Sequence, residues 1–179
     1  MKKISVFAGN DCFKERQKHY FGLAYQTGKL LAENKFITVT GAGTGLMEEV
    51  SRGAFEAGGE TMGIGLDFGG RVQSKYVKTI EIFKNLGPRQ EKLITLADAY
   101  IALPGGVGTF FEIYNILGLK RLGEIPKDMP LILISDYFSM IQETLEKMME
   151  EGFLEKSASS LYTIVNTPEE AMEILKEQI

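Results

Sequence analysis

The sequence predicts an α/β protein of three layers, in which helices cover both faces of a mainly parallel sheet of about seven strands. Short β-type runs alternate with longer helical patterns along the whole chain, which is typical of a parallel sheet. Most of these runs are almost continuously apolar, as expected when helices bury both faces. The chain has 179 residues, and neither a repeat nor a Pro/Ser-rich linker divides it. We therefore expect a single domain over residues 1–179.

The predicted elements alternate in chain order. Seven runs qualify as strands, at residues 4–8, 36–40, 60–66, 78–83, 99–103, 131–135 and 161–165. Six helical patterns lie between or after them, at residues 12–34, 45–57, 88–97, 108–122, 136–150 and 168–178. The last helix has a clear start, because Thr167 can cap it, Pro168 suits the first helical position and Glu170 completes a capping box. The segment 67–77 is too short for a crossover helix, so we expect it to recross the sheet as an irregular loop.

The composition excludes several kinds of partner and site. Lys and Arg total 20 against 24 Asp and Glu, which gives a net charge of −4 and a sequence pI near 5.2. Such a surface has no general attraction for nucleic acid or anionic membranes, so we expect neither as a partner. With Cys12 and His19 as its only cysteine and histidine, the chain predicts no disulfide and no metal site. No apolar run suits a secretory signal or a membrane span of ~20 residues, so we expect a cytoplasmic protein.

Glycine is unusually frequent, and the glycine-rich segments follow predicted strands. Of the 20 glycines, ten lie between Gly41 and Gly70. Gly9 and Asn10 follow the first strand, and a second group, Gly41, Gly43 and Gly45, follows the second strand. The segment 104–109 follows the fifth strand and contains Gly105, Gly106, Gly108 and Thr109. In a parallel sheet, all these positions lie at the edge formed by the carboxyl ends of the strands, where open α/β sheets bind their ligands.

A strand, a glycine-rich turn and a helix form the usual arrangement for binding phosphate, through free backbone N–H groups and the positive end of the helix. Both glycine-rich turns fit this arrangement, although neither is a P-loop, because no Gly-Lys-Ser/Thr follows. Either turn alone is also explained by close packing of helix against strand. Two such turns at one edge favour an anionic ligand the size of a nucleotide.

Two charged residues lie at the same edge, and each has a second explanation. Glu112 comes three residues after Thr109, so the pair is either a capping box or a carboxylate that overhangs the ligand. Arg89 lies near the start of a predicted helix, where a cation opposes the helix dipole. A bound anion would remove that conflict, and so would a local pair with Glu91.

The predicted helix at 108–122 carries apolar residues around almost its whole circumference: Phe110, Phe111, Ile113, Tyr114, Ile116, Leu117 and Leu119. A helix that is apolar on nearly all sides must be buried on nearly all sides. Because the sheet covers only one face, we expect a second subunit to cover much of the other, as a two-fold homodimer.

The segments TGAGTGLMEEVSRGAFEAGG and PRQEKLITLADAYIALPGGVGTFFE resemble the Lonely Guy family of cytokinin-activating phosphoribohydrolases. The most specific element is Pro-Gly-Gly-x-Gly-Thr-x-x-Glu at 104–112, with an arginine upstream of the preceding strand. The resemblance implies a Rossmann-like fold, usually dimeric, that hydrolyses the N-glycosidic bond of a nucleoside 5′-monophosphate to a free base and ribose 5-phosphate.

The resemblance also implies a role for each matching residue. Arg89 and Glu112 match the catalytic pair of the family. Two loops match its nucleotide site, with phosphate-binding residues Gly105, Gly106, Gly108 and Thr109 and a second glycine-rich group Gly41, Gly43 and Gly45. Glycosidic cleavage develops positive charge on the sugar, which a carboxylate stabilises, so we expect neither a cofactor nor a metal.

The chain departs from the family pattern at four positions. Gln90 stands where Lys is common, Phe111 where a second Glu is common, Ala42 at the middle glycine of the first loop, and Glu48 at another common glycine. These departures leave open a second interpretation, a binding or carrier protein such as the molybdenum cofactor carriers, which have the same fold. Similar proteins are often labelled possible lysine decarboxylases, but such enzymes need pyridoxal phosphate on a lysine with supporting residues, and we find no such set in the sequence.

Overall fold

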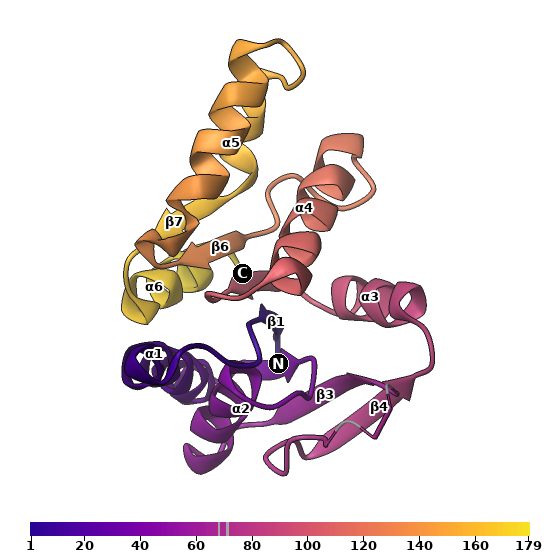
Figure 1. The fold of residues 1–179 in the computed structure, drawn as a ribbon, viewed down its shortest axis with the longest axis vertical. Helices are drawn as coiled ribbons and strands as arrows, with labels where there is room; N and C mark the ends of the chain where they lie inside the picture. The colour runs from indigo at the N-terminus through magenta and orange to yellow at the C-terminus, as the bar shows by residue number, and fades with distance from the viewer. Residues whose placement is uncertain (68, 71) are drawn as a thin grey trace.

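The computed structural model describes residues 1–67, 69–70 and 72–179. The described residues form the strands β1 (Lys3–Phe7), β2 (Ile37–Thr40), β3 (Thr61–Leu66), β4 (Thr79–Phe83), β5 (Ala99–Ala102), β6 (Leu131–Ile134) and β7 (Thr163–Val165). All neighbouring strands pair in parallel, in the order β4-β3-β2-β1-β5-β6-β7 (Figure 1). The predicted α/β class and parallel sheet are confirmed, and each predicted strand overlaps an observed one.

Helices connect most of the strands. They are α1 (Lys14–Glu33), α2 (Leu46–Glu56), α3 (Leu86–Thr95), α4 (Val107–Leu122), α5 (Ser139–Glu150) and α6 (Pro168–Gln178), with short 3-10 helices η1 (Asp136–Phe138) and η2 (Lys156–Leu161). No helix in the described part of the chain is both long enough and apolar enough to cross a membrane.

Two hydrophobic clusters, one on each face of the sheet, hold the helices in place. On one face, Val6 of β1 belongs to a cluster with α1, α2 and α6, which includes Leu31. On the other face, Phe7 of β1 belongs to a cluster with α3, α4 and α5, which includes Ile113 and Ile141. Successive residues of a strand point to opposite faces, so β1 supplies both clusters. The three-layer arrangement is therefore confirmed.

The strand β4 forms one edge of the sheet and is less covered than the sequence led us to expect. Ile80 and Ile82 are 45% and 53% exposed. The chain reaches β4 through a loop whose described residues contain no helix, as predicted for this segment, so one covering helix is missing at this edge. Within the loop, the Ser74 N–H donates to the Ala42 carbonyl oxygen at 2.9 Å, which ties the loop to the end of β2.

The last strand and helix show how local signals set the boundaries. Thr167 Oγ1 accepts a hydrogen bond from the Glu170 N–H at 3.3 Å, which confirms the predicted cap of α6. The Glu170 carboxylate accepts from the Asn166 N–H at 2.8 Å rather than from Thr167 itself. The strand β7 begins at Thr163, two residues later than predicted, because η2 continues to the buried Leu161.

Candidate active site

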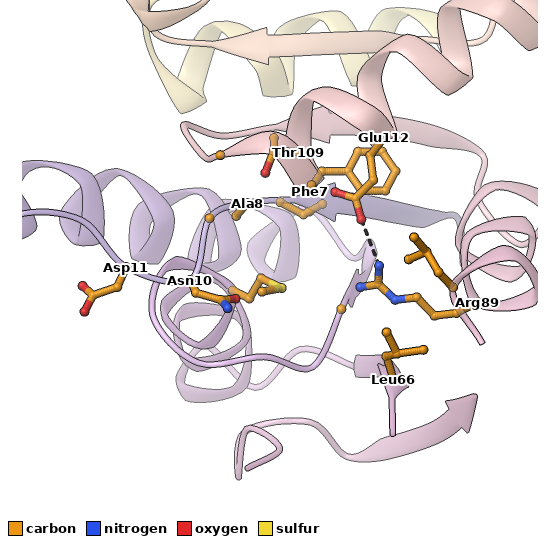
Figure 2. Close-up of a pocket in the computed structure, with 15 residues that line it drawn as sticks. Phe7, Ala8, Asn10, Asp11, Leu66, Arg89, Thr109 and Glu112 are labelled. Atoms are coloured by element: carbon orange, nitrogen blue, oxygen red, sulfur yellow. Dashed lines mark hydrogen bonds and ion pairs between the residues drawn. The ribbon is translucent and has the colours of Figure 1, made fainter. Parts of the chain in front are cut away.

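A cavity of about 400 Å³ opens at the carboxyl ends of β1, β2, β3 and β5 (Figure 2). Eight of the eleven residues predicted for the site line it: Gly9, Asn10, Gly41, Arg89, Gly106, Gly108, Thr109 and Glu112. They come together because every strand of the sheet runs in the same direction, so the segments after the strands share one edge.

At the centre of the cavity wall, Arg89 of α3 and Glu112 of α4 form an ion pair. The Arg89 Nη1 to Glu112 Oε1 distance is 3.1 Å, and both side chains are only 11% exposed. Arg89 Nε also donates to the carbonyl oxygen of Ile64 in β3 at 3.0 Å, which fixes the guanidinium between a strand and a helix. Burial raises the pKa of the Glu112 carboxyl to about 7, although the positive charge of Arg89 opposes the shift.

The capping-box interpretation of Thr109 and Glu112 is wrong. The helix α4 begins at Val107 with Gly106 as its N-cap, so Thr109 is already the third helical residue. Glu112 lies almost a turn further into the helix, and its carboxylate meets Arg89 instead of a backbone N–H at the helix start. Likewise, α3 begins at Leu86, so Arg89 is the fourth residue of the helix and not its first. Its guanidinium extends away from the start of the helix and lines the cavity.

The other three predicted site residues do not line this cavity. Gly45 is the N-cap of α2 with a φ of +69°, and a Cβ there would overlap the backbone carbonyl of Asn10, so its role in the structure is close packing of two loops. Gly43 is buried in the same turn. Gly105 lines a neighbouring cavity of about 240 Å³. The tight-turn explanation therefore fits Gly45 better than contact with a ligand.

Gly41 is constrained by the side chain of Arg89. A Cβ at this position would overlap Arg89 Nη2, so only glycine lets the guanidinium lie against the end of β2. In contrast, a Cβ on Gly106 or Gly108 would meet no atom within 4 Å. These two glycines leave the first turn of α4 open to the cavity, and its N–H groups have no partner within the helix.

Several lining residues were absent from the sequence prediction: Val6, Phe7, Ala8, Asp11, Met47, Leu66 and Leu86. Most are apolar, and they form the walls between the polar groups. Leu66 ends β3 and Leu86 begins α3. The same rule that located the glycines, the shared edge at the carboxyl ends of the strands, could have identified these two.

The chain is similar to known proteins over most of its length. The family model described as "Possible lysine decarboxylase" matches residues 47–175, well over half of the chain. The chain belongs to the Lonely Guy family.

Two relatives and one solved structure illustrate the likeness. The probable cytokinin riboside 5′-monophosphate phosphoribohydrolase LOGL2 of Oryza sativa subsp. japonica is 28% identical over 179 residues, covering 98% of this chain and 72% of the relative. Cytokinin riboside 5′-monophosphate phosphoribohydrolase LOG7 of Arabidopsis thaliana is also 28% identical over 179 residues, covering 98% of this chain and 80% of LOG7. The molybdenum cofactor binding protein of Rippkaea orientalis superposes with a TM-score of 0.76 at 24% identity, covering 98% of this chain and 96% of that one, which shows a shared fold.

Two departures from the Lonely Guy pattern, Gln90 and Phe111, lie together outside the active cavity. Both line a separate cavity between α3 and α4, where Gln90 is buried and Phe111 is 47% exposed. The Gln90 amide has no hydrogen-bond partner among the residues that the structure describes. Each residue is the chain neighbour of a member of the ion pair, but neither lines the cavity that Arg89 and Glu112 share. Neither replacement therefore lies in the wall of the candidate active site.

Proposed function

We propose that this protein hydrolyses the N-glycosidic bond of a nucleoside 5′-monophosphate to a free base and ribose 5-phosphate. The observation that carries the proposal is the buried Arg89–Glu112 pair in a cavity that also contains the open glycine turn at 106–109. The names of the relatives LOGL2 and LOG7 describe the same class of reaction. The cavity, at about 400 Å³, lies within the range of small-molecule sites.

In this proposal, the start of α4 binds the phosphate. Gly106 and Gly108 present backbone N–H groups without a side chain in the way, and the positive end of the helix dipole favours an anion there. Thr109 lines the cavity one turn before Glu112 and can donate its hydroxyl to the same phosphate. The ribose and base would then extend toward the ion pair.

The chemical step needs a negative charge beside the sugar. The bond from C1′ to the base nitrogen breaks with its electron pair on the base, and positive charge develops on the ribose ring. The Glu112 carboxylate stabilises that charge and positions a water molecule. The water oxygen bonds to C1′, and a proton passes to the departing nitrogen. Arg89 orients Glu112 and opposes the effect of burial on its pKa, and the guanidinium is itself fixed by the Ile64 carbonyl oxygen.

A second candidate function is binding without turnover, as in a carrier. The 3.1 Å contact between Arg89 and Glu112 favours it, because a carboxylate whose charge is already balanced by a guanidinium has less of that charge left to stabilise a sugar cation. The molybdenum cofactor binding protein of Rippkaea orientalis shares the fold.

Incubation with a panel of nucleoside 5′-monophosphates, with the free base measured by chromatography, tests the enzyme against the carrier. The matching nucleosides without phosphate are the control, because they lack the group that the glycine turn would bind. We expect base release from at least one monophosphate and none from its nucleoside. Binding of several monophosphates without any release would establish the carrier instead.

We also propose that the protein is a two-fold homodimer. The exposed side of α4 carries Val107 and Phe111, which are 88% and 47% exposed, and Leu122 at its end is 72% exposed. Apolar side chains in such number on one helix are typical of an interface.

A further inference from the structure

The active cavity has a neighbour that the proposed reaction does not use. This second cavity, of about 240 Å³, shares Asp11 and Gly106 with the first. It also contains Cys12 and Tyr20 from the start of the chain and Tyr137 from η1. In Figure 2, Asp11 and the Arg89–Glu112 pair lie at opposite ends of the labelled residues, with Asn10 and Ala8 between them. Gly106 of the glycine turn therefore lies at the boundary of the two cavities.

The two cavities lie on either side of the point where the strand order reverses. From β1, the sheet continues through β2 and β3 in one direction and through β5 and β6 in the other. The first cavity contains Gly41, which follows β2, and Leu66, which ends β3, whereas the second contains Tyr137, which follows β6. In doubly wound sheets, a dinucleotide crosses the sheet edge at this switch point, with its pyrophosphate at the glycine-rich turn.

The walls of the second cavity suit a ring better than a free phosphate. Two half-buried aromatic rings, Tyr20 and Tyr137, lie there with their centroids 6.4 Å apart. The Tyr137 hydroxyl donates to the Gly105 carbonyl oxygen at 2.8 Å, which holds this ring against the glycine turn. No Lys or Arg occurs among the described residues that line this cavity, and Asp11 adds a negative charge. Aromatic faces bind planar rings by stacking, whereas a terminal phosphate would meet no cation.

The two cavities adjoin at Asp11 and Gly106, which line both of them. A Cβ on Gly106 would meet nothing within 4 Å, so no side chain separates the two spaces at this residue. A ligand with its phosphate on the Gly106 turn can therefore extend in both directions.

We propose that the two cavities form one extended site for a dinucleotide-like ligand, in which the 5′-phosphate of a nucleotide is joined to a second group that bears an aromatic ring. This inference rests on the proposed function for the orientation of the nucleotide. The nucleotide half occupies the cavity with Arg89 and Glu112, and the second ring occupies the cavity with Tyr20 and Tyr137. Hydrolysis at C1′ would release the base by adding water across that bond alone, and the ribose 5-phosphate would remain joined to the second group.

Binding of three probes, measured by calorimetry, tests the extended site: AMP, ADP and diadenosine 5′,5′-diphosphate. ADP carries the second phosphate without a second ring, so it is the matched control. We expect diadenosine diphosphate to bind about tenfold more tightly than ADP, because stacking one ring contributes an affinity gain of about this size. Equal affinity for ADP and diadenosine diphosphate would overturn the proposal.

Cys12 offers a direct readout of the second cavity, because it is the only cysteine in the chain. Alkylation by iodoacetamide, followed by mass spectrometry, measures how accessible its thiol is. Diadenosine diphosphate at saturation should slow the alkylation several-fold, and AMP at saturation should leave the rate nearly unchanged. Equal rates with both ligands would contradict a second ring in this cavity.

A filling variant separates this inference from the proposed function. Cys12→Phe should remove the tenfold advantage of diadenosine diphosphate and leave AMP binding intact, whereas Cys12→Ser should behave as the wild type. If Cys12→Phe does not fold, the alkylation rates of the wild-type protein still test whether a second ring occupies this cavity. Hydrolysis of AMP without any preference for diadenosine diphosphate overturns the extended site only. If diadenosine diphosphate binds tightly and protects Cys12 from alkylation but no probe is hydrolysed, the extended site is supported and the proposed hydrolytic activity is rejected.

Discussion

Arg89 and Glu112 meet at 3.1 Å from two different helices, and the same guanidinium donates to the carbonyl oxygen of Ile64 in β3. One side chain thus connects α3, α4 and the sheet at the wall of the cavity. Both members of the pair are nearly buried, so their interaction is screened little by solvent. The predictions below use this pair to separate catalysis from folding.

Glu112→Gln should abolish most of the turnover and keep the fold. The amide oxygen of glutamine still accepts a hydrogen bond from Arg89, but the negative charge that stabilises the sugar cation is lost. We expect the hydrolysis rate to fall by roughly two orders of magnitude or more, with nucleotide binding retained. Rates by chromatography, binding by calorimetry and Tm measure the three effects. A variant that hydrolyses its nucleotide at the wild-type rate would contradict a catalytic role for Glu112.

Unlike Glu112→Gln, Arg89→Ala should lower the stability of the protein and weaken nucleotide binding, in addition to slowing hydrolysis. It leaves the Glu112 carboxylate buried without its cation and removes the donor to Ile64. Removing one member of a buried pair costs about 3 kcal/mol, so we expect the free energy of unfolding to fall by that order. Chemical denaturation measures the loss. When Glu112→Gln is already present, Arg89→Ala should lower the free energy of unfolding by clearly less. Equal losses with and without Glu112→Gln would show that the two residues are not coupled.

The pH dependence of activity should follow the ionisation of Glu112. Because burial raises the pKa of this carboxyl to about 7, the reactive carboxylate forms only as the pH rises through neutrality. We expect kcat/KM to increase with pH and to level off above about 7. The nucleotide phosphate also titrates, near pH 6, so the pH dependence of AMP binding to Glu112→Gln serves as the baseline. A rate that is constant from about pH 5 to about pH 8, where folded proteins are usually most stable, would contradict the assignment.

Stability should change with pH in the opposite direction. The folded pKa of Glu112 lies above its ordinary value of 4.5, so its contribution to stability is complete below about 4.5 and is lost as the pH rises through about 7. Between these values the folded protein binds more protons than the unfolded chain. The loss amounts to roughly 3 kcal/mol at most, since one pKa unit corresponds to about 1.4 kcal/mol. Glu112→Gln should remove this part of the pH dependence, which denaturation at pH values on either side of the transition would reveal.

The homodimer prediction is tested by mass in solution. Sedimentation should give about twice the chain mass of 19.9 kDa at micromolar concentration. Phe111→Glu places a charge on the exposed side of α4 and should produce monomers. Phe55→Glu is the matched control, because Phe55 is 42% exposed on α2, which covers the opposite face of the sheet from α4. A wild-type monomer of about 20 kDa would remove the idea.

The position of the site could be predicted from the sequence, because it depends on the direction of the strands and not on their exact contacts. The apolar runs predict a parallel sheet, and a parallel sheet brings the segments after its strands to one edge. Arg89 and Glu112 were therefore expected at the same edge as the glycine-rich turns. Their pairing was not expected, since 22 residues intervene between them and a local explanation existed for each one.

Local patterns failed where tertiary packing decided the outcome. The spacing of Thr109 and Glu112 fits a capping box, but Gly106 begins the helix and Glu112 turns toward Arg89. Gly45 was expected at the ligand because it belongs to a glycine-rich turn. Its positive φ and its close approach to Asn10 give it a packing role that sequence spacing cannot distinguish from a binding role.

Alanine replacements at two glycines should separate the two ends of the cavity. In Gly41→Ala, the new methyl group overlaps Arg89 Nη2, so the guanidinium must move and its geometry with Glu112 is lost. We expect the hydrolysis rate to fall by tenfold or more, at roughly constant stability, because the end of a flexible side chain can shift cheaply. In Gly108→Ala, the methyl group meets no protein atom but occupies space where the phosphate would lie. We expect weaker binding of the nucleotide with Arg89 and Glu112 undisturbed.

Gly22→Ala is the control for both replacements, because Gly22 lies on the exposed surface of α1 and a Cβ there meets nothing within 4 Å. Alanine in the interior of a helix should raise the free energy of unfolding by about 0.5–1 kcal/mol and leave catalysis unchanged. Steady-state kinetics should therefore show a lower kcat for Gly41→Ala and a higher KM for Gly108→Ala. If the two variants show the same split between kcat and KM, the phosphate does not lie at the start of α4, and the orientation proposed for the nucleotide is reversed.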